Sequence, residues 1–362
     1  MTISNRKQVA KLFSLCKLAK NAARQKLIIE VLLALLECKK IQLNELSLHI
    51  DSKAKEVSTE RRLQDFFAKF TFDYDLVALL LYSCLPKGKV TLCIDRTEWD
   101  FGKYQCNILI ISAYFNGTSI PIYWELLDNK SGNSSSEARI DLLKKCVQLI
   151  GKNRILRIVG DREFIGKDWI GYLVRENIGF CFRVPQHHQI LLKNGCLTTV
   201  KELLTSKAIR KFQQVIVDSN RCNLYIKKLK NDYLFLIGNE FSGDLGSIYR
   251  LRWSIEVLFQ SCKQRGFNLE ETHFKSSEKI KKLLVFVFLA FAICINTGIL
   301  LHSKEKCINI KNHGYKANSY FRVGLNAWRR FIKNKAENLL LAYFARYCKI
   351  ITHKLKNYKS SS

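Results

Sequence analysis

One short segment, SIYRLRWSIEVLFQSCKQRGF, carries the chain's densest set of side chains able to act on a phosphate group. Tyr249, Arg252, Glu256 and Lys263 are separated by three, four and seven residues, and at 3.6 residues per turn this spacing places all four on one face of a helix. An acid, two cations and a phenol on one face can hold a phosphodiester backbone. A solvated helix surface has the same spacing, so the spacing alone does not establish a site.

Two aspartates at the ends of apolar segments supply a second candidate cluster. Asp95 closes TLCID and Asp161 closes RIVGD. Carboxylates at the ends of neighbouring strands can converge on one ligand, whereas a single aspartate at a strand end usually caps a turn. Two of them in the same context favour a site, and Glu256 can complete a cluster of three carboxylates.

The elements that must position these carboxylates are predicted to form a mixed sheet with helical crossovers. Alternation and apolar runs predict three sequential strands that form an antiparallel meander, followed by a helix, a strand, a helix and a strand. This is the element order of the ribonuclease H fold. The predicted ranges are Lys89–Asp95, Tyr104–Phe115, Ser119–Leu127, Ala138–Ile150, Arg154–Val159, Lys167–Asn177 and Phe180–Val184.

The regular order is interrupted after the last of these strands. Residues 186–245 hold further strand-like runs and are expected to form a β-rich insertion, and a helix over Leu245–Arg265 resumes the α/β pattern. The apolar segment Leu283–Leu301 is long enough to span a bilayer. Asn296 interrupts it, no second such segment exists, and a buried core helix has the same composition. We therefore expect a core helix and no membrane partner.

The two ends of the chain are expected to be helical and basic. Residues 1–85 predict helices that include a helix-turn-helix-like pair, and Arg61 and Arg62 on the helix Thr59–Phe70 can lie along phosphates. A plain helical bundle with a solvated basic face explains this region equally well. Residues 304–362 carry 14 Lys and Arg against 2 Asp and Glu.

Composition narrows the class of partner. The chain has 60 Lys and Arg against 31 Asp and Glu, a net charge of +29, and a field of that size attracts polyanions. Nucleic acid is the leading candidate, and an acidic membrane surface is the competitor. The 13 cysteines form no C-x-x-C pair, which favours reduced thiols over disulfides or a zinc site. With no secretory signal apparent, we expect a cytoplasmic, nucleoid-associated bacterial protein.

The spacing Y-x2-R-x3-E-x6-K, together with CIDRTEW around Asp95 and GDREF around Asp161, resembles the signature of DDE transposases of the insertion-sequence-four (IS-four) group. The likeness covers roughly residues 85–300, and RRLQDFF resembles the family's DNA-binding region more weakly. The β-rich insertion also resembles the interrupted ribonuclease H domain of that family. The implied domains are a helical DNA-binding domain (1–85), a split ribonuclease H-like core (86–185 and 246–303), the insertion (186–245) and a basic region (304–362).

The resemblance implies roles for the signature residues. Asp95, Asp161 and Glu256 bind two divalent ions, Mg²⁺ or Mn²⁺, while Tyr249, Arg252 and Lys263 hold DNA near the cleaved phosphate. Hard oxygen ligands suit these ions, and two ions can activate the attacking oxygen and stabilise the leaving one. The implied reaction is cleavage of double-stranded DNA at the element's terminal inverted repeats, followed by joining of the freed 3′-OH to target DNA by a homodimer.

The sequence also contains other candidate residues and is compatible with other functions. Trp253 can stack on a displaced base, but a buried core position is the expectation for it, and Glu98 and Glu163 are expected to support the aspartates or to face solvent. The main alternative is a catalytically inactive, transposon-derived DNA-binding protein. A single-span membrane protein and a stand-alone ribonuclease H-like nuclease are the other two.

Overall fold

The computed structural model divides the chain into two compact units. The helical unit comprises Met1–Pro86, Trp99–Cys106 and Phe259–Ser362, and the sheet unit comprises Lys87–Glu98 and Asn107–Leu258. The residues that the structure describes are 4–101, 104–127, 132–239, 244–263, 266–304, 307–312, 314, 316–333, 340–342, 344–345, 348–349 and 352–353.

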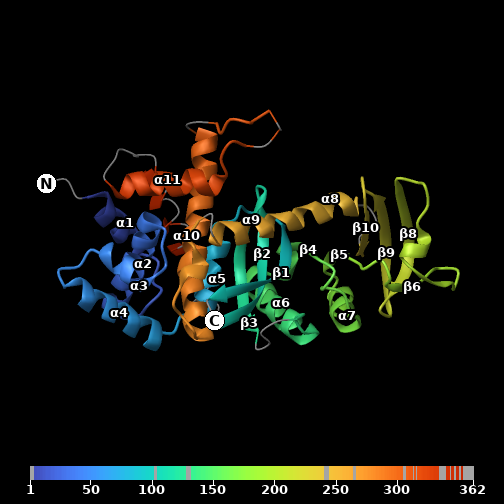
Figure 1. Ribbon diagram of the computed structural model, residues 1–362, viewed down its shortest axis with the longest axis horizontal. Helices are drawn as coiled ribbons and strands as arrows, with labels where there is room; N and C mark the ends of the chain where they lie inside the picture. Colours follow the sequence, from blue (N-terminus) through green and yellow to red (C-terminus); the bar gives the residue numbers. More distant parts are fainter. Residues whose placement is uncertain are drawn as a thin grey trace. The chain divides into compact units, whose positions relative to one another are not determined.

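A single mixed sheet is the scaffold of the sheet unit (Figure 1). Among the described residues ten strands join in the order β3-β2-β1-β4-β5-β10-β9-β8-β6-β7. The pairs β1/β4 and β4/β5 are parallel, and β2/β3, β5/β10, β9/β10 and β8/β9 are antiparallel. The strands are β1 (Val90–Phe101), β2 (Tyr104–Phe115), β3 (Thr118–Leu127), β4 (Ile155–Gly160), β5 (Gly179–Arg183), β6 (Gln189–Leu191), β7 (Leu197–Thr199), β8 (Ile209–Val217), β9 (Asn220–Lys228) and β10 (Tyr233–Gly238).

Helices cover both faces of this sheet, which is why its central strands are apolar throughout. On β5, Cys181 Sγ donates a hydrogen bond to the carbonyl of Leu245 on α8, while the ring of the next residue, Phe182, lies 6.2 Å from that of Trp169 on α7. Successive side chains of a strand point to opposite faces, so α7 and α8 pack on opposite faces (Figure 1). The helical segments of this unit are α6 (Ser136–Ile150), η1 (Lys152–Arg154), α7 (Lys167–Arg175), η2 (Lys201–Leu203), α8 (Leu245–Tyr249), η3 (Arg250–Arg252) and α9 (Trp253–Cys262), the last of which ends in the helical unit.

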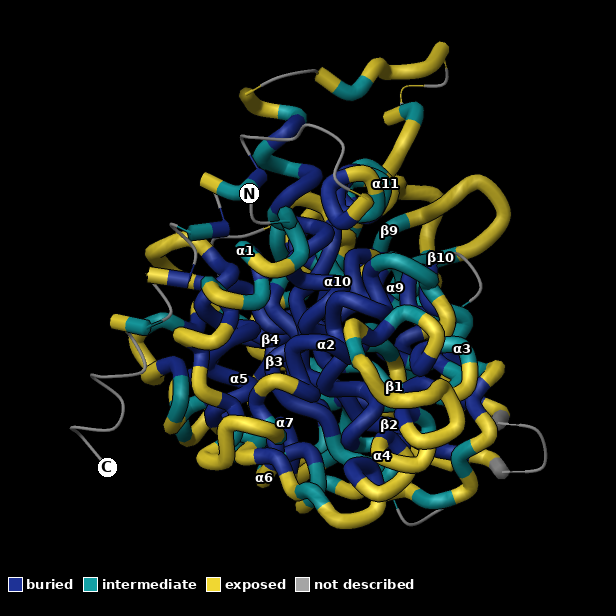
Figure 2. The backbone as a smooth tube through the Cα atoms, turned by 90° about the vertical axis from the view of Figure 1, so that its left-hand side faces the viewer, coloured by how far each residue is buried: buried dark blue, intermediate teal, exposed yellow. Residues whose placement is uncertain are grey.

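The helical unit is organised around one long apolar helix, α10, which contacts α2, α4, α5 and α11. Figure 2 shows α10 and α2 buried over most of their length. A Cβ atom added at Gly298 of α10 would lie 1.9 Å from the carbonyl oxygen of Tyr320, so glycine is what allows α11 to cross so closely. The helices are α1 (Asn5–Phe13), α2 (Ala22–Cys38), α3 (Leu43–Leu48), α4 (Glu56–Lys69), α5 (Tyr74–Tyr82), η4 (Leu269–Glu271), α10 (Ser277–Lys304) and α11 (Tyr320–Ile332).

The helix α10 contains the segment that raised the membrane alternative. Within the described residues it alone is long and apolar enough to cross a bilayer, and its most apolar stretch has a mean hydropathy of 2.6. The structure buries 89% of that stretch. Trp328 of α11 donates a hydrogen bond of 2.9 Å to Thr297 inside it, so even its polar interruption has a partner in the core. The expected core position of this segment is confirmed.

The mixed α/β architecture with a large sheet and many helices agrees with the sequence-based prediction, but two predicted elements are wrong in detail. The first strand does not end at Asp95, because β1 continues to Phe101. The predicted single helix Leu245–Arg265 is divided into α8, a 3₁₀ turn and α9 ending at Cys262. Residues 264–265, at the predicted end of that helix, lie outside the described residues, as does part of the basic region 304–362.

Candidate active site

The parallel pairing of β1 with β4 brings the two motif aspartates to the same place. Cys93 pairs with Val159 at the end of the described register, and Asp95 and Asp161 each follow two residues later. Side chains two residues apart on a strand share a face, so both carboxylates leave the sheet on the same side. Asp161 comes directly after β4, as predicted, whereas Asp95 lies within β1 just beyond the part of the strand that pairs with β4.

Burial and mutual repulsion mark Asp95 as an unusual carboxyl. Its side chain is only 14% exposed. The pKa of Asp95 is raised to about 7, and burial is the largest cause. The carboxylates of Glu163 and Asp161 raise this pKa further, whereas Arg252 and the backbone N–H of Arg96 lower it. Two acids held this close favour a positive group between them.

The segment α8–η3–α9 supplies that positive group and the third acid. Arg252 Nη1 donates to Asp95 Oδ2 at 3.0 Å, and Arg252 Nη2 donates to Glu256 Oε1. The Tyr249 hydroxyl donates to Asp161 Oδ1 at 3.0 Å. Five of the sequence-predicted site residues are therefore brought together, and a single guanidinium joins two of the three acids.

The 3₁₀ turn η3 helps one continuous segment to reach both aspartates. It begins directly after Tyr249 and ends at Arg252, and Glu256 lies four residues after Arg252 in the first turn of α9. Ser254 lies on the opposite side of α9 and fixes the helix to the sheet. Its Oγ is 3.5 Å from Cys93 Sγ and shares a second hydrogen bond with the hydroxyl of Ser119. The helix is thereby held against β1 with its polar residues at the carboxylates.

The protonation states follow from these contacts. Although burial opposes its charge, Arg252 has a pKa above the ordinary arginine value because Tyr249 and the three carboxylates favour the cation. Burial and the neighbouring Asp161 raise the pKa of Tyr249. The phenol therefore stays protonated at neutral pH, as a hydrogen-bond donor requires.

A second set of side chains connects the part of β1 that carries Asp95 to the turn after β4 that carries Asp161. Arg96, which follows Asp95, donates from Nε to Glu163 Oε2 at 3.1 Å and from Nη1 to Glu98 Oε1 at 2.5 Å. Ser134 donates to the other oxygen of Glu163 at 3.3 Å and accepts from Arg139 at 2.8 Å. Glu163 is thus held from two sides, so the expectation that it supports the aspartates agrees with the geometry.

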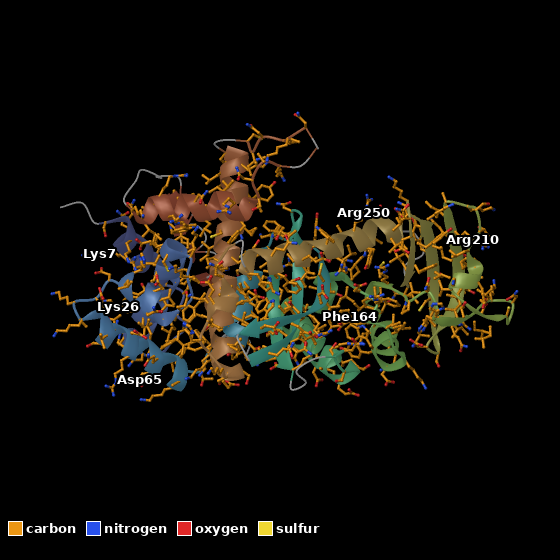
Figure 3. The ribbon with its side chains drawn as sticks, in the orientation of Figure 1. Lys7, Lys26, Asp65, Phe164, Arg210 and Arg250 are labelled. Atoms are coloured by element: carbon orange, nitrogen blue, oxygen red, sulfur yellow. The ribbon has the colours of Figure 1, made fainter. Side chains whose placement is uncertain are left out.

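The residue before Asp161, Gly160, has no room for a side chain. A Cβ at Gly160 would lie 2.9 Å from the Phe164 ring and 3.0 Å from Ile94. Phe164, labelled in Figure 3, carries the guanidinium of Arg139 over its ring at 5.1 Å. The turn after β4 is therefore packed tightly enough to fix the direction of Asp161.

The other sequence-predicted binding residues, Lys263, Arg61 and Arg62, belong to the helical unit, whereas Trp253 belongs to the sheet unit. Lys263 directly follows the last residue of α9, its backbone N–H still donates to the carbonyl of Phe259 at 3.0 Å, and its Nζ lies 3.1 Å from Glu270 Oε1. Arg61 and Arg62 lie exposed on α4. Trp253, between Arg252 and its partner acid, is 61% exposed, which corrects the expectation of a buried core position.

Sequence reasoning did not find Arg96, Ser134 and Arg139. A signal for Arg96 was present, because each motif aspartate is followed by an arginine and then by a nearby glutamate, in DRTE and DRE. Ser134 and Arg139 had no such signal, since they reach Glu163 only through the fold.

The donor set fits a hard divalent cation by chemistry, because three carboxylates supply only oxygen ligands. In the arrangement described, the charge that such an ion would bring is supplied by Arg252. Among the described residues, no three His, Cys, Asp or Glu side chains are gathered closely enough to hold a metal ion. Binding an ion at Asp95 and Glu256 would therefore require the guanidinium to release them.

The comparisons with known proteins indicate the family to which the chain belongs. The sequence profile described as "Transposase DDE domain" matches residues 86–293, more than half of the chain. No curated protein sequence matches the chain. A similar solved structure is the piggyBac transposase in a synaptic complex with hairpin DNA, with 13% identity, a TM-score of 0.49, and coverage of 96% of this chain and 86% of that one. Because this match covers more than half of the chain, the chain belongs to the family of transposases with a DDE domain.

Proposed function

We propose that this chain is a cut-and-paste DNA transposase of the insertion-sequence-four group, with Asp95, Asp161 and Glu256 as its catalytic carboxylates. The observation that supports this proposal best is the parallel β1/β4 register, which sends both aspartates to one face of the sheet, where Arg252 connects Asp95 to Glu256. Neither a turn cap nor a solvated helix requires that convergence.

The three carboxylates would hold Mg²⁺ or Mn²⁺, in the proposal two ions. When bound, such ions activate the attacking oxygen and stabilise the leaving one. The protein's own groups position the substrate: Arg252, once released from the acids, and Lys263 contact phosphates, and the Tyr249 hydroxyl donates a hydrogen bond near the scissile group. Trp253, exposed beside Arg252, is available to stack on an unpaired base.

The proposed reaction has two steps that balance without a covalent protein intermediate. Water attacks a phosphodiester at the end of the element, the bond from phosphorus to the 3′-oxygen breaks, and that oxygen leaves as a 3′-OH. The 3′-OH then attacks a target phosphodiester, forming one P–O bond as another breaks. A homodimer acting on two terminal inverted repeats, and closure of a hairpin before joining, complete the proposal.

The test is incubation of the purified full chain with a labelled duplex carrying the terminal repeat of its own element, with Mg²⁺ or with EDTA. Wild type is compared with Glu256→Gln and with the control Glu176→Gln, whose carboxylate pairs with Lys152 on the surface of the same unit. We expect metal-dependent cutting at the repeat end by wild type and the control, no cutting by Glu256→Gln, and joined products when target DNA is added.

Two other results would contradict the proposal. Binding of the duplex without cutting in Mg²⁺ or Mn²⁺ would favour the alternative of a catalytically inactive DNA-binding protein. Cutting that is never followed by joining would favour a nuclease.

A further inference from the structure

The segment that carries Tyr249, Arg252 and Glu256 begins with a helix too short to hold its own direction. The helix α8 has five residues, and Tyr249 is the last of them. Isolated helices shorter than about 12 residues are marginal in water, so a helix of this length depends on its cap and on the structure packed against it. The groups that hold the first turn of α8 therefore help to set where Tyr249 points.

The residue that caps α8 is Asp244. Its Oδ1 accepts a hydrogen bond from the backbone N–H of Gly246 at 3.2 Å, and its Oδ2 accepts one from the Ser247 hydroxyl at 2.6 Å. A side-chain oxygen at this position satisfies a backbone donor that the first turn of a helix leaves free. These hydrogen bonds, that of Ser247 first, lower the pKa of Asp244 although desolvation opposes them, so the carboxylate is charged at neutral pH.

A tyrosine of the β-rich insertion holds the same carboxylate. Tyr225 of β9 is only 2% exposed, and its hydroxyl forms a hydrogen bond with Asp244. Burial is the largest cause that raises the pKa of Tyr225, and Asp244 raises this pKa further, so the phenol is protonated and is the donor. A Cβ added at Gly246 would lie 3.0 Å from this hydroxyl, so Tyr225 packs directly against the first turn of α8.

The register of the sheet places Tyr225 on the face that α8 covers. Tyr225 of β9 pairs with Leu236 of β10, which pairs in turn with Arg183 of β5. Residues directly opposite each other on neighbouring strands share a face, as do residues two apart on one strand. Arg183 therefore shares its face with Cys181, whose thiol donates to the carbonyl of Leu245 on α8. Tyr225 lies on this same face, and α8 contacts β4, β5, β9 and β10.

We propose that the Tyr225 hydroxyl is a positioning group for Tyr249. By holding Asp244 it fixes the direction of α8, and α8 brings the Tyr249 hydroxyl to within 3.0 Å of Asp161 Oδ1. The inference rests on the proposed function, in which Tyr249 donates a hydrogen bond near the scissile group. Tyr225 acts through the helix and not on the reacting atoms, because its partner Asp244 lies five residues before Tyr249. The insertion thereby braces the segment that carries the site.

The first test is a double-mutant cycle on cleavage by the full chain at saturating duplex in Mg²⁺. Wild type is compared with Tyr225→Phe, with Tyr249→Phe and with the variant that carries both substitutions. The control is Tyr233→Phe on the neighbouring strand β10, where the ring stacks on that of Phe235 at 6.2 Å. Anisotropy of a fluorescein-labelled duplex in EDTA measures the affinity for DNA, and circular dichroism measures the thermal unfolding midpoint.

We expect Tyr225→Phe to lower the rate of cutting roughly tenfold, at the lower end of what outer partners contribute, with the affinity for DNA unchanged. In the Tyr249→Phe background the same substitution should change the rate less than about twofold, because groups that act through one another are not additive. Tyr233→Phe should keep the wild-type rate. Equal losses from Tyr225→Phe in both backgrounds, a loss confined to DNA affinity, or equal rates of Tyr225→Phe and Tyr233→Phe would overturn the inference.

The second test does not depend on cutting. Amide hydrogen exchange is measured by mass spectrometry in EDTA without DNA, on the peptides that cover residues 245–256. Tyr225→Phe should speed exchange there roughly tenfold, as expected for the loss of one hydrogen bond, and should leave peptides of α6 unchanged. Tyr233→Phe should change neither region. Unchanged exchange over 245–256, an equal rise in α6, or faster exchange with an unchanged rate of cutting would contradict the positioning role.

The positioning inference and the proposed function fail separately. If wild type cuts and Glu256→Gln does not, but Tyr225→Phe cuts and exchanges like wild type, the positioning inference fails alone. If wild type never cuts while Tyr225→Phe exchanges faster over 245–256, the proposed function fails and the bracing of α8 by Tyr225 stands.

Discussion

The carboxylate cluster of the sheet unit and the basic surface of the helical unit formed by Lys7, Lys11, Lys17, Lys20 and Lys26 use charge in opposite ways. In the cluster, Arg252 is 12% exposed and bonded to Asp95 and Glu256, so each charge has a partner and a fixed position. On the basic surface these five lysines are exposed, and none of the ion pairs between described residues involves them. The difference separates two tasks: chemistry requires exact positions, whereas holding a polyanion requires a sum of charges.

The largest effect that this comparison predicts is at Asp95. Because the three acids act as a unit, Asp95→Asn should reduce cutting roughly 10⁴-fold or more, while the salt dependence of DNA binding stays unchanged. The assay is cleavage of the labelled duplex in Mg²⁺, and Asp100→Asn, an exposed position on the same strand, is the control. Equal activity of the two variants would break the distinction between the cluster and the surface.

A second effect concerns stability without metal. Arg252→Ala leaves the partly buried carboxylates of Asp95 and Glu256 without their cation, so the free energy of unfolding in EDTA should fall by about 2 kcal/mol. Because a divalent ion can replace the missing charge, added Mg²⁺ should stabilise this variant more than it stabilises wild type. The measurement is urea unfolding with and without the ion.

Its matched control is Arg250→Ala. Arg250 is exposed and donates only to Ser247 among the contacts described for it, so its loss should change stability by no more than about 0.5 kcal/mol. Equal losses in the two arginine variants would mean that the guanidinium of Arg252 does not compensate the acids.

The third effect tests how the cluster is positioned. Glu163→Gln weakens the tie between Arg96 and the end of β4, and outer partners of this kind generally contribute 10- to 100-fold to activity, so a loss in about that range is expected. Glu98→Gln removes the neighbouring Arg96 contact without touching β4 and should cost less. Cleavage rates at saturating DNA measure both, and a larger loss in Glu98→Gln would contradict the proposed tie.

The smallest effect concerns the connection between α1 and α2, which carries Lys17 and Lys20 of the basic surface and is held by hydrogen bonds to the side chain of Gln25. Gln25→Ala leaves the N–H groups of Leu18 and Ala19 unsatisfied, which should cost about 1 to 3 kcal/mol of stability and lower the salt slope of DNA binding. Gln64→Ala, on the surface of α4 with only Glu60 as its described partner, should change neither. A normal slope in a destabilised Gln25 variant would show that the connection need not be fixed for DNA binding.

Much of the cluster was predictable because local patterns encode it. The apolar strand before Asp161 and the spacing of Tyr249, Arg252 and Glu256 follow from the periodicity of strands and helices, and the structure brings all of them together. The end of the predicted helix was wrong, because α9 ends at Cys262, one residue before Lys263. Helix ends depend on local backbone hydrogen bonds that spacing does not reveal.

What the sequence did not reveal depends on distant contacts. The continuation of β1 past Asp95 was missed because the polar residues that follow look like a turn. Arg139 reaches Glu163 through Ser134 only after α6 packs beside the sheet. The basic surface forms only when α1, α2 and the connection between them fold together, so the balance of charge along residues 1–85, which is only modestly basic, did not indicate it.

The most direct test of the central claim exchanges one oxygen ligand for sulfur. Carboxylates suit Mg²⁺, whereas a thiolate favours softer ions, so the Asp161→Cys variant is assayed for cleavage of the labelled duplex in Mg²⁺ and in Mn²⁺ beside wild type. We predict that wild type cuts in both ions and that the variant cuts in Mn²⁺ alone. Undiminished cutting by the variant in Mg²⁺ would contradict the assignment of Asp161 as a metal ligand.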